Sequence, residues 1–207
     1  MKCPLCFSPL KININQDYFD CSTCGAIVKD DKKHISSVEE KKVYELHNND
    51  VNDKRYQKFT SPISNYILDK YDRNAKGLDF GSGTGPVISK VLQDKGYKNI
   101  HQYDPYFCPD RSVLKTFYNF IFSCEVVEHF KSPSQEYESL FKVLNSGGRL
   151  IIMTLIYDSS FDFNDWYYKD DPTHIFIHRK ETFEYIAKKF GATIEYMDAR
   201  LIVIKKN

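Results

Sequence analysis

A glycine-rich stretch at residues 77–86 carries the first residues that could do chemistry. It begins as a short apolar strand, becomes a run of alternating glycines and leads directly into a helix. Glycines let a ligand approach the backbone, and a helix start presents unpaired N–H groups, so the stretch predicts a nucleotide-binding turn. Asp79 precedes the turn with a negative charge that suits an ammonium or sulfonium group better than a pyrophosphate. The turn residues expected to contact the ligand are Gly81, Ser82, Gly83 and Gly85.

Four cysteines near the N-terminus form a second group. Cys3-x-x-Cys6 is followed by Cys21-x-x-Cys24, and each turn of this kind can aim two thiolates at one ion. The first residues lack the apolar core of a signal peptide, so we expect a cytoplasmic protein in which these cysteines bind zinc rather than form disulfides. Residues 1–33 are predicted to be a zinc ribbon whose ion holds together a segment too short for its own core. Binding of substrate, RNA or a partner protein by the ribbon is the lesser alternative.

An acid, Asp104, ends the second predicted strand. It follows Asp79 at the interval at which a parallel α/β sheet places the carboxylate that binds ribose hydroxyls. Residues 105–118 then lead to an apolar strand at 119–124 and are too few for a crossover helix, a strand and a second crossover. We therefore expect the third strand to be very short or missing, which leaves Asp110 as a weak candidate for adenine recognition.

Three motifs resemble those of the class I S-adenosylmethionine-dependent methyltransferases. The Asp-x-Gly-x-Gly-x-Gly spacing resembles their motif I. Glu-Val-Val-Glu-His-Phe at 125–130 resembles the motif that follows the fourth strand in small-molecule members of the ubiquinone-biosynthesis type, and Leu-x-x-Gly-Gly-x-Leu at 144–150 is a third family feature. The resemblance implies that S-adenosylmethionine is the cofactor, that Cys124 and Glu125 line it and that His129 lies near the methyl acceptor.

A polar and aromatic loop, residues 157–178, follows the fifth predicted strand. Its Trp-x-x-x-x-Asp-x-Thr-His segment, which ends at His174, resembles an acceptor-pocket motif of the same methyltransferases. Methyl transfer from a sulfonium is an in-line displacement, so alignment supplies much of the acceleration, and a base is needed only if the acceptor must lose a proton. His174 and His129 are the candidate bases, with Asp171 as an orienting carboxylate.

A linker at residues 34–60 connects the ribbon to the main domain. A Ser-Val-Glu-Glu capping box at 37–40 opens a helix that reaches about residue 47, and residues 48–53 break it. In methyltransferases this region commonly folds over the cofactor as a lid. The resemblance therefore makes Tyr56 a candidate cofactor contact.

The remaining residues, 61–207, are predicted to form a class I methyltransferase domain with a doubly wound, Rossmann-like α/β sheet. Ser61 and Pro62 signal the start of its first helix. Strands at about 193–197 and 199–206 close the sheet. An antiparallel last strand distinguishes methyltransferase sheets from dinucleotide-binding ones.

Composition limits the function. The chain has 207 residues, a formal net charge of +1 and 28% charged residues, which suits a medium globular domain with a small appendage. This near-neutral charge weighs against a strongly basic surface for nucleic acid, and no apolar run reaches membrane-spanning length. We therefore expect transfer of a methyl group to a small metabolite, aromatic ones included, on oxygen in preference to carbon or nitrogen.

Two other functions stay open. Ribosomal RNA guanine methyltransferases also place a Cys-Pro-Leu-Cys zinc finger, the sequence of residues 3–6 here, before a class I domain. Such an enzyme would use the ribbon to recognise RNA and would bind it in a salt-sensitive manner. A non-catalytic protein of the same fold would use the ribbon to recruit a partner, but the intact glycine-rich turn and Asp104 argue against this.

Overall fold

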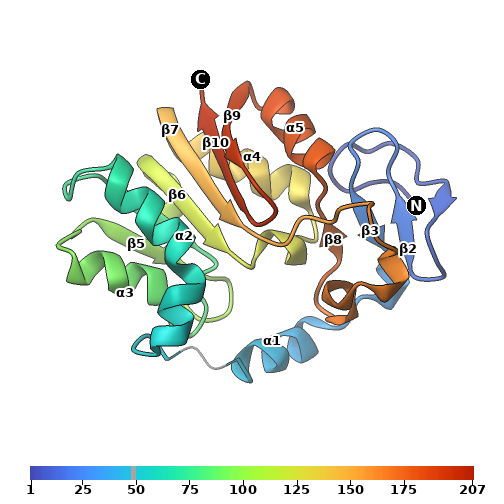
Figure 1. Ribbon diagram of the computed structural model, residues 1–207, viewed down its shortest axis with the longest axis horizontal. Helices are drawn as coiled ribbons and strands as arrows, with labels where there is room; N and C mark the ends of the chain where they lie inside the picture. Colours follow the sequence, from blue (N-terminus) through green and yellow to red (C-terminus); the bar gives the residue numbers. More distant parts are fainter. Residues whose placement is uncertain (48–49) are drawn as a thin grey trace.

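The computed structural model describes residues 1–47 and 50–207, and its centre is a six-stranded sheet with the order β5-β4-β6-β7-β10-β9 (Figure 1). Strands β5, β4, β6 and β7 run parallel, whereas β10 runs antiparallel to both β7 and β9. The predicted α/β sheet with an antiparallel last strand is thus confirmed. The strands are β4 (Gly77–Phe80), β5 (Ile100–Tyr103), β6 (Tyr118–Cys124), β7 (Leu144–Met153), β9 (Ala192–Met197) and β10 (Leu201–Lys206).

The third strand of the usual doubly wound sheet does not occur among the described residues, as predicted. Strand β5 lies at the edge of the sheet, and the chain returns from it to β6 through a short bridge between Asp104 and Cys108 and a 3-10 helix, η2 (Arg111–Lys115). A parallel crossover needs a dozen or more residues, so this segment is too short to add a strand and return.

Helices cover both faces of the sheet (Figure 1). In β6, Phe120 and Phe122 join the core beneath α2 and α3, whereas Ile121 joins the core beneath α4 and α5. This alternation buries both faces of the central strands, which explains their continuous apolar sequence. Within the described residues, no helix is long and apolar enough to cross a membrane. The helices are α2 (Lys54–Lys70), α3 (Val87–Asp94), α4 (Pro133–Val143) and α5 (Lys180–Lys189).

Helix α1 (Ser37–Glu45) links the ribbon to the main domain and starts with a capping box, as predicted. The box forms one residue earlier than expected. Ser36 is the N-cap, its Oγ accepts a hydrogen bond from the Glu39 N–H at 3.3 Å, and the Glu39 carboxylate accepts one from the Ser36 N–H at 2.9 Å. The predicted break at 48–53 begins with residues 48 and 49, which lie outside the described residues.

Helix α2 starts earlier than the sequence predicts, with Asp53 as its N-cap, so the predicted start at Ser61 and Pro62 is wrong. Pro62 lies inside the helix, where it cannot donate a hydrogen bond to the carbonyl of Lys58. The Ser61 hydroxyl donates to that carbonyl instead, at 2.7 Å. The Ser-Pro pair, which in the sequence looks like a helix start, therefore lies inside the helix, and its serine replaces the hydrogen bond that the proline removes. The last residues assigned to the linker, 54–60, share one helix with the first residues of the main domain.

The cysteine-containing segment forms three short strands, and a fourth strand joins them from a distant part of the chain. The sheet order is β1-β2-β3-β8, and all pairs are antiparallel. Strand β8 belongs to the loop predicted to hold the acceptor, and the sequence does not predict this pairing. Figure 1 shows the ribbon beside β8 and α5. These strands are β1 (Ile12–Asn13), β2 (Tyr18–Asp20), β3 (Ile27–Lys29) and β8 (Phe176–Ile177).

The ribbon also packs on α4 and α5. The Lys189 ammonium donates to the Leu5 carbonyl at 3.0 Å, and the Ser134 N–H donates to the Pro4 carbonyl at 3.4 Å. Three of the four cysteines are buried in the same core as these helices. The remaining short 3-10 helices are η1 (Asp31–Lys33), η3 (Val127–His129), η4 (Phe163–Asp165) and η5 (Tyr167–Asp170).

Candidate active site

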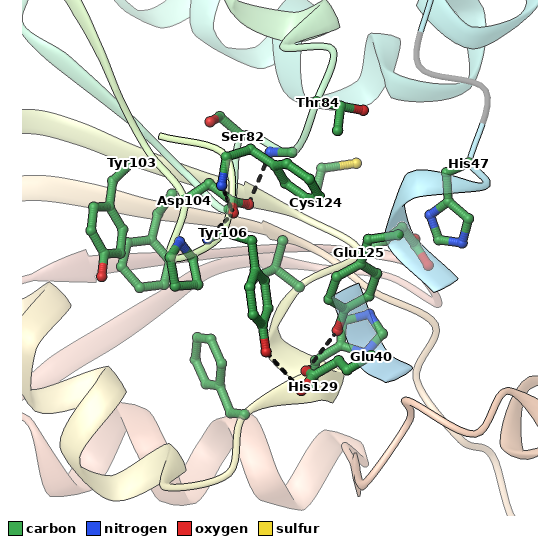
Figure 2. Close-up of a pocket in the computed structure, with 18 of the residues that line it drawn as sticks. Glu40, His47, Ser82, Thr84, Tyr103, Asp104, Tyr106, Cys124, Glu125 and His129 are labelled. Carbon is green, nitrogen blue, oxygen red and sulfur yellow. Dashed lines mark hydrogen bonds between the residues drawn. The ribbon is translucent and has the colours of Figure 1, made fainter. Parts of the chain in front are cut away.

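A cavity of about 720 Å³ opens at the carboxyl ends of β4, β5 and β6 and is bounded on one side by α1 (Figure 2). Its volume is in the range of small-molecule and cofactor sites, and this edge of a parallel sheet is where such ligands bind. The predicted site residues that line it are Tyr56, Gly81, Ser82, Gly83, Asp104, Cys124, Glu125, His129, Asp171 and His174.

The glycine-rich turn and Asp104 are joined by hydrogen bonds. The Asp104 carboxylate accepts from the N–H groups of Gly83 at 3.1 Å, Tyr106 at 2.8 Å and Phe107 at 3.0 Å. Gly81 has a φ of +82°, and a Cβ at this position would lie 2.4 Å from a methyl carbon of Val126. Gly83, with a φ of +61°, faces open space in which a Cβ would meet no atom within 4 Å. Bare backbone thus borders the cavity here, and a nucleoside could approach it closely.

Two predicted cofactor residues, Asp79 and Gly85, lie behind the cavity wall rather than on it. Both are buried, and the Asp79 carboxylate accepts a hydrogen bond from the Ser89 hydroxyl at 2.6 Å. Burial, together with the nearby charge of Asp104, raises the pKa of Asp79 to about 7. At neutral pH a cation bound nearby would therefore favour the ionised form of Asp79.

Two carboxylates, Glu125 and Glu128, share the hydroxyl of Tyr168. This hydroxyl lies 2.9 Å from a Glu125 oxygen and also contacts a Glu128 oxygen, while the Thr154 hydroxyl donates to Glu128 at 3.0 Å. Glu125 has a φ of +52°, uncommon for a residue other than glycine, and pairs with Arg200 at 3.2 Å. Burial raises the pKa of each glutamate to about 7. The sequence motif contains Glu128 but does not by itself assign it a role.

Two histidine rings meet at the opposite end of the cavity from the turn. The centroids of His129 and His174 are 4.9 Å apart. His129 Nδ1 lies 2.9 Å from the Thr173 carbonyl, and His174 Nδ1 lies 2.6 Å from the Tyr168 carbonyl. Burial lowers the pKa of both rings, that of His174 to about 4, so both are neutral at pH 7. Asp171 lines the cavity beside them, and its Oδ2 lies 4.0 Å from His174 Nε2.

The side of the cavity formed by α1 belongs to residues 34–60, which the sequence predicts to be a cofactor lid, but the sequence does not single out Glu40. The Glu40 carboxylate is buried and accepts from the hydroxyls of Tyr44 and Tyr106, both at 3.0 Å, and from the Lys131 ammonium at 2.6 Å. In Figure 2, Tyr106 extends from the Asp104 end of the cavity toward Glu40, which lies beside His129. The capping box predicts the helix, but nothing in its weak apolar pattern marks Glu40 as an inward residue.

Two other sequence-based expectations fall outside the cavity. Asp110, the candidate for adenine recognition, caps η2 by accepting from the Ser112 N–H at 2.8 Å. Arg111 and Leu114 of that 3-10 helix line the cavity instead. Trp166 is buried against other rings, with centroids 5.3 Å from Tyr157 and 5.1 Å from Tyr168, and does not line the cavity.

The four ribbon cysteines form a cluster whose dimensions suit a zinc ion. Cys3 and Cys24 sulfurs are 3.6 Å apart, Cys6 and Cys21 sulfurs are 3.4 Å apart, and all four lie within 4.8 Å of one another. A tetrahedron with Zn–S distances of about 2.3 Å has S–S edges of about 3.8 Å. The residues therefore fit the ion that their spacing predicts.

Comparison with known proteins agrees with this geometry. The family model described as "Methyltransferase domain" matches residues 52–196, more than half of the chain. The chain belongs to this methyltransferase family. The predicted enzyme class, an S-adenosylmethionine-dependent methyltransferase, is thereby confirmed. No curated protein sequence matches the chain.

Solved structures share the fold at low sequence identity. The PH0226 protein from Pyrococcus horikoshii OT3 is 15% identical, with a TM-score of 0.54 over 80% of this chain and 99% of its own. Magnesium protoporphyrin IX methyltransferase (ChlM) from Synechocystis PCC 6803, with bound S-adenosylmethionine, is 13% identical, with a TM-score of 0.52 over 83% of this chain and 92% of its own. LaPhzM is 11% identical, with a TM-score of 0.52. The matched region covers 73% of this chain and 56% of the length of LaPhzM.

Proposed function

We propose that the protein transfers the methyl group of S-adenosylmethionine to an oxygen atom of a small metabolite. The observation that carries the proposal is the continuity of one cavity between two chemically different ends. Gly83 and Asp104 line one end, and His129, Asp171 and His174 line the other. A cofactor and an acceptor could therefore lie in one cavity with their reacting atoms adjacent.

The cofactor end is assigned from its hydrogen-bonding groups. Asp104 would bind the ribose hydroxyls, since its carboxylate already lies against the turn and is held by three N–H groups. Gly81, Ser82 and Gly83 would border the amino acid part, and Cys124 and Tyr56 the reacting centre. Adenine would lie along η2, whose Arg111 and Leu114 line the cavity at the place where the described part of the chain has no third strand. The structure of ChlM, which has a similar fold and contains bound S-adenosylmethionine, supports this choice of ligand.

The acceptor end would orient a hydroxyl and receive its proton. When bound, S-adenosylmethionine supplies an electrophilic methyl carbon, and the C–O bond forms as the C–S bond breaks, leaving S-adenosylhomocysteine. His129 and His174 direct the Nε2 sides of their neutral rings away from the carbonyls that hold Nδ1. Asp171 and Glu125 line the same cavity and can take or orient the proton. A phenol, whose hydroxyl is easily ionised, is the acceptor that suits this end best.

The ribbon is proposed to bind zinc and to support the acceptor side. Strand β3 pairs with β8, and the Lys29 N–H donates to the Ile175 carbonyl at 3.0 Å, next to His174. A structural ion in the ribbon would thus fix one wall of the acceptor end without contacting the substrate.

A methyl-donor turnover screen tests the function. Purified protein would be incubated with labelled S-adenosylmethionine and a panel of small phenols, quinols and ribosomal RNA. We expect transfer to a phenolic oxygen, and an Asp104→Asn variant with roughly 10- to 100-fold weaker binding of S-adenosylhomocysteine, because a hydrogen bond to a charged group contributes about 1.5–3 kcal/mol. Asp94→Asn, at the exposed end of α3 and outside the cavity, is the matched control and should bind normally.

Two results would contradict the proposal and favour the alternatives. Methyl transfer to RNA but to no small acceptor, with tight and salt-sensitive RNA retention on a filter, would indicate an RNA methyltransferase. Calorimetry that detects no binding of S-adenosylmethionine would indicate a non-catalytic protein that uses the ribbon to recruit a partner.

A further inference from the structure

One lobe of the cavity extends from Asp104 to η2 and α4. The Asp104 carboxylate accepts hydrogen bonds from the N–H groups of Tyr106 and Phe107, which belong to the wall of this lobe. Helix α4 lies beside η2, in the segment that leads from β5 to β6 without a third strand among the described residues. Apolar and polar side chains from both elements and their neighbours line the lobe: Phe107, Leu114 and Phe130, and Arg111, Glu136 and Ser139.

The covalent structure of the cofactor directs adenine into this lobe. Adenine is attached to the ribose, for which Asp104 is the proposed ligand. Asp104 Oδ2 accepts from the Gly83 N–H of the glycine-rich turn, whereas Oδ1 accepts from Tyr106 and Phe107. Since the amino acid part of the cofactor is proposed to border the turn, the base extends in the other direction, toward η2 and α4. This step rests on the proposed function, because it starts from the proposed position of the ribose.

A pocket for adenine needs apolar contacts for the two faces of the ring and an acceptor for its 6-amino group. The amino group is a hydrogen-bond donor that distinguishes adenine from other purines. Burying such a donor without a partner costs free energy, so a tight adenine site places an acceptor there. Phe107, Leu114 and Phe130 provide apolar surface in the lobe. The acceptor has to come from one of the polar residues.

Glu136 lines the lobe with a carboxylate oxygen that has no donor. Its Oε2 accepts from the Ser132 N–H at 3.1 Å, and within residues 1–47 and 50–207 no hydrogen bond reaches Oε1. The neighbouring cation, Lys131, is paired with Glu40 at 2.6 Å instead. Burial raises the pKa of Glu136 to about 7, with Lys131 acting in the opposite direction. A donor from a bound molecule would complete the hydrogen bonding of this carboxylate.

The other acids that line the cavity are already engaged or lie elsewhere. The Glu40 carboxylate accepts from two tyrosine hydroxyls and an ammonium group. Glu125 is paired with Arg200 at 3.2 Å, and Asp171 lies beside His174 at the opposite end. Glu136 is therefore the acid that suits the base.

We propose that Glu136 recognises the adenine of S-adenosylmethionine by accepting a hydrogen bond from its 6-amino group. A base without a donor at this position would leave Oε1 unpartnered, so the residue determines cofactor specificity. The role expected of Asp110, which caps η2 outside the cavity, passes to a residue of α4. In the described part of the chain no third strand separates α4 from the lobe, which lets this side chain reach the base.

Calorimetry with two ligands tests the assignment at pH 8, where Glu136 is mostly ionised. One ligand is S-adenosylhomocysteine, and the other is its analogue with purine as the base, which lacks only the 6-amino group. We expect the unchanged protein to bind S-adenosylhomocysteine roughly 10- to 100-fold more tightly than the analogue, as for a hydrogen bond to a charged acceptor. In Glu136→Met this preference should disappear through weaker binding of S-adenosylhomocysteine. Glu138→Met, the same change at an exposed position of the same helix, should keep it.

A second variant keeps the proposal testable if Glu136→Met does not fold. Glu136→Gln retains an acceptor for the Ser132 N–H but loses the charge, so the preference for adenine should fall about fivefold. A folded variant of either kind that keeps the full preference, or an unchanged protein that binds both ligands equally, would overturn the role of Glu136 and leave the proposed function intact. Failure of the unchanged protein to bind S-adenosylhomocysteine at all would refute the proposed function, and adenine recognition with it.

Discussion

The hydroxyl of Tyr18, in the ribbon, lies 3.2 Å from the backbone carbonyl of His174, at the acceptor end of the cavity. The same hydroxyl donates to the Lys169 carbonyl at 2.9 Å. Tyr18 is buried. Its hydroxyl thus connects the ribbon to two residues, Lys169 and His174, that lie about 150 positions later in the chain. The ribbon therefore holds the backbone that carries a candidate catalytic residue.

Replacing Tyr18 with Phe tests this link. The Lys169 and His174 carbonyls would lose the one hydroxyl proton that they share, so we expect the free energy of unfolding, measured in urea, to fall by about 1–2 kcal/mol. The KM for the acceptor should rise while the KM for S-adenosylmethionine stays unchanged, because only the acceptor wall loses support. Tyr167→Phe is the control, since that side chain is 66% exposed. Equal changes in both KM values would show that the ribbon acts on the whole domain.

Loss of the zinc ion proposed for the ribbon should weaken the proposed acceptor wall before the glycine-rich turn. We expect Cys24→Ser to lower zinc content and to speed hydrogen exchange in β8, because β8 pairs with β3 of the ribbon. Exchange in β4 should change little. Cys108→Ser, outside the cluster, is the matched control. A variant that loses zinc but keeps normal exchange in β8 would contradict the proposed role of the ribbon.

Asp79 should make the ligand-free protein less stable as pH rises. Its pKa is about 7 when folded and 3.8 in its ordinary state, so between these values the folded protein keeps a proton that the unfolded chain has lost. The free energy of unfolding therefore falls with pH across this interval, by about 4 kcal/mol in all, and levels off above pH 7.

Urea unfolding of the Asp79→Asn variant between pH 4 and pH 8 measures this contribution. Glu125 and Glu128 have raised pKa values and contribute slopes of the same sign, so the difference from the unchanged protein isolates Asp79. We expect the variant to gain relative stability as pH rises. A difference that does not vary with pH would show that Asp79 ionises normally in the folded state.

Glu40 should hold α1 against the cavity. In Glu40→Gln the ion pair with Lys131 is lost and an amide N–H₂ group is buried beside two tyrosine hydroxyls. We expect a loss of about 1–3 kcal/mol in stability and faster hydrogen exchange across residues 37–45. Glu45→Gln, at the exposed end of the same helix, provides the comparison. Unchanged exchange in α1 would mean that its other contacts suffice to hold it.

Local chemistry was readable from the sequence alone. The glycine-rich turn, the Cys-x-x-Cys pairs and the apolar strands each depend on neighbouring residues, so their structures follow from spacing and propensity. The short segment after Asp104 even predicts the missing strand, because chain length limits what a crossover can contain. The same local reasoning failed at Pro62, which it placed at the start of a helix. Pro62 lies inside α2 instead, because the Ser61 hydroxyl supplies the hydrogen bond that the proline cannot make.

Contacts between distant segments were decided only by the tertiary structure. No sequence pattern pairs β3 with β8, turns Glu40 inward or brings His129 and His174 rings to within 4.9 Å. These arrangements depend on how the ribbon and α1 pack on the finished sheet, and burial then sets the protonation of the groups enclosed. The sequence thus determined the glycine-rich turn and the cysteine pairs, whereas folding decided which side chains meet at the opposite end of the cavity.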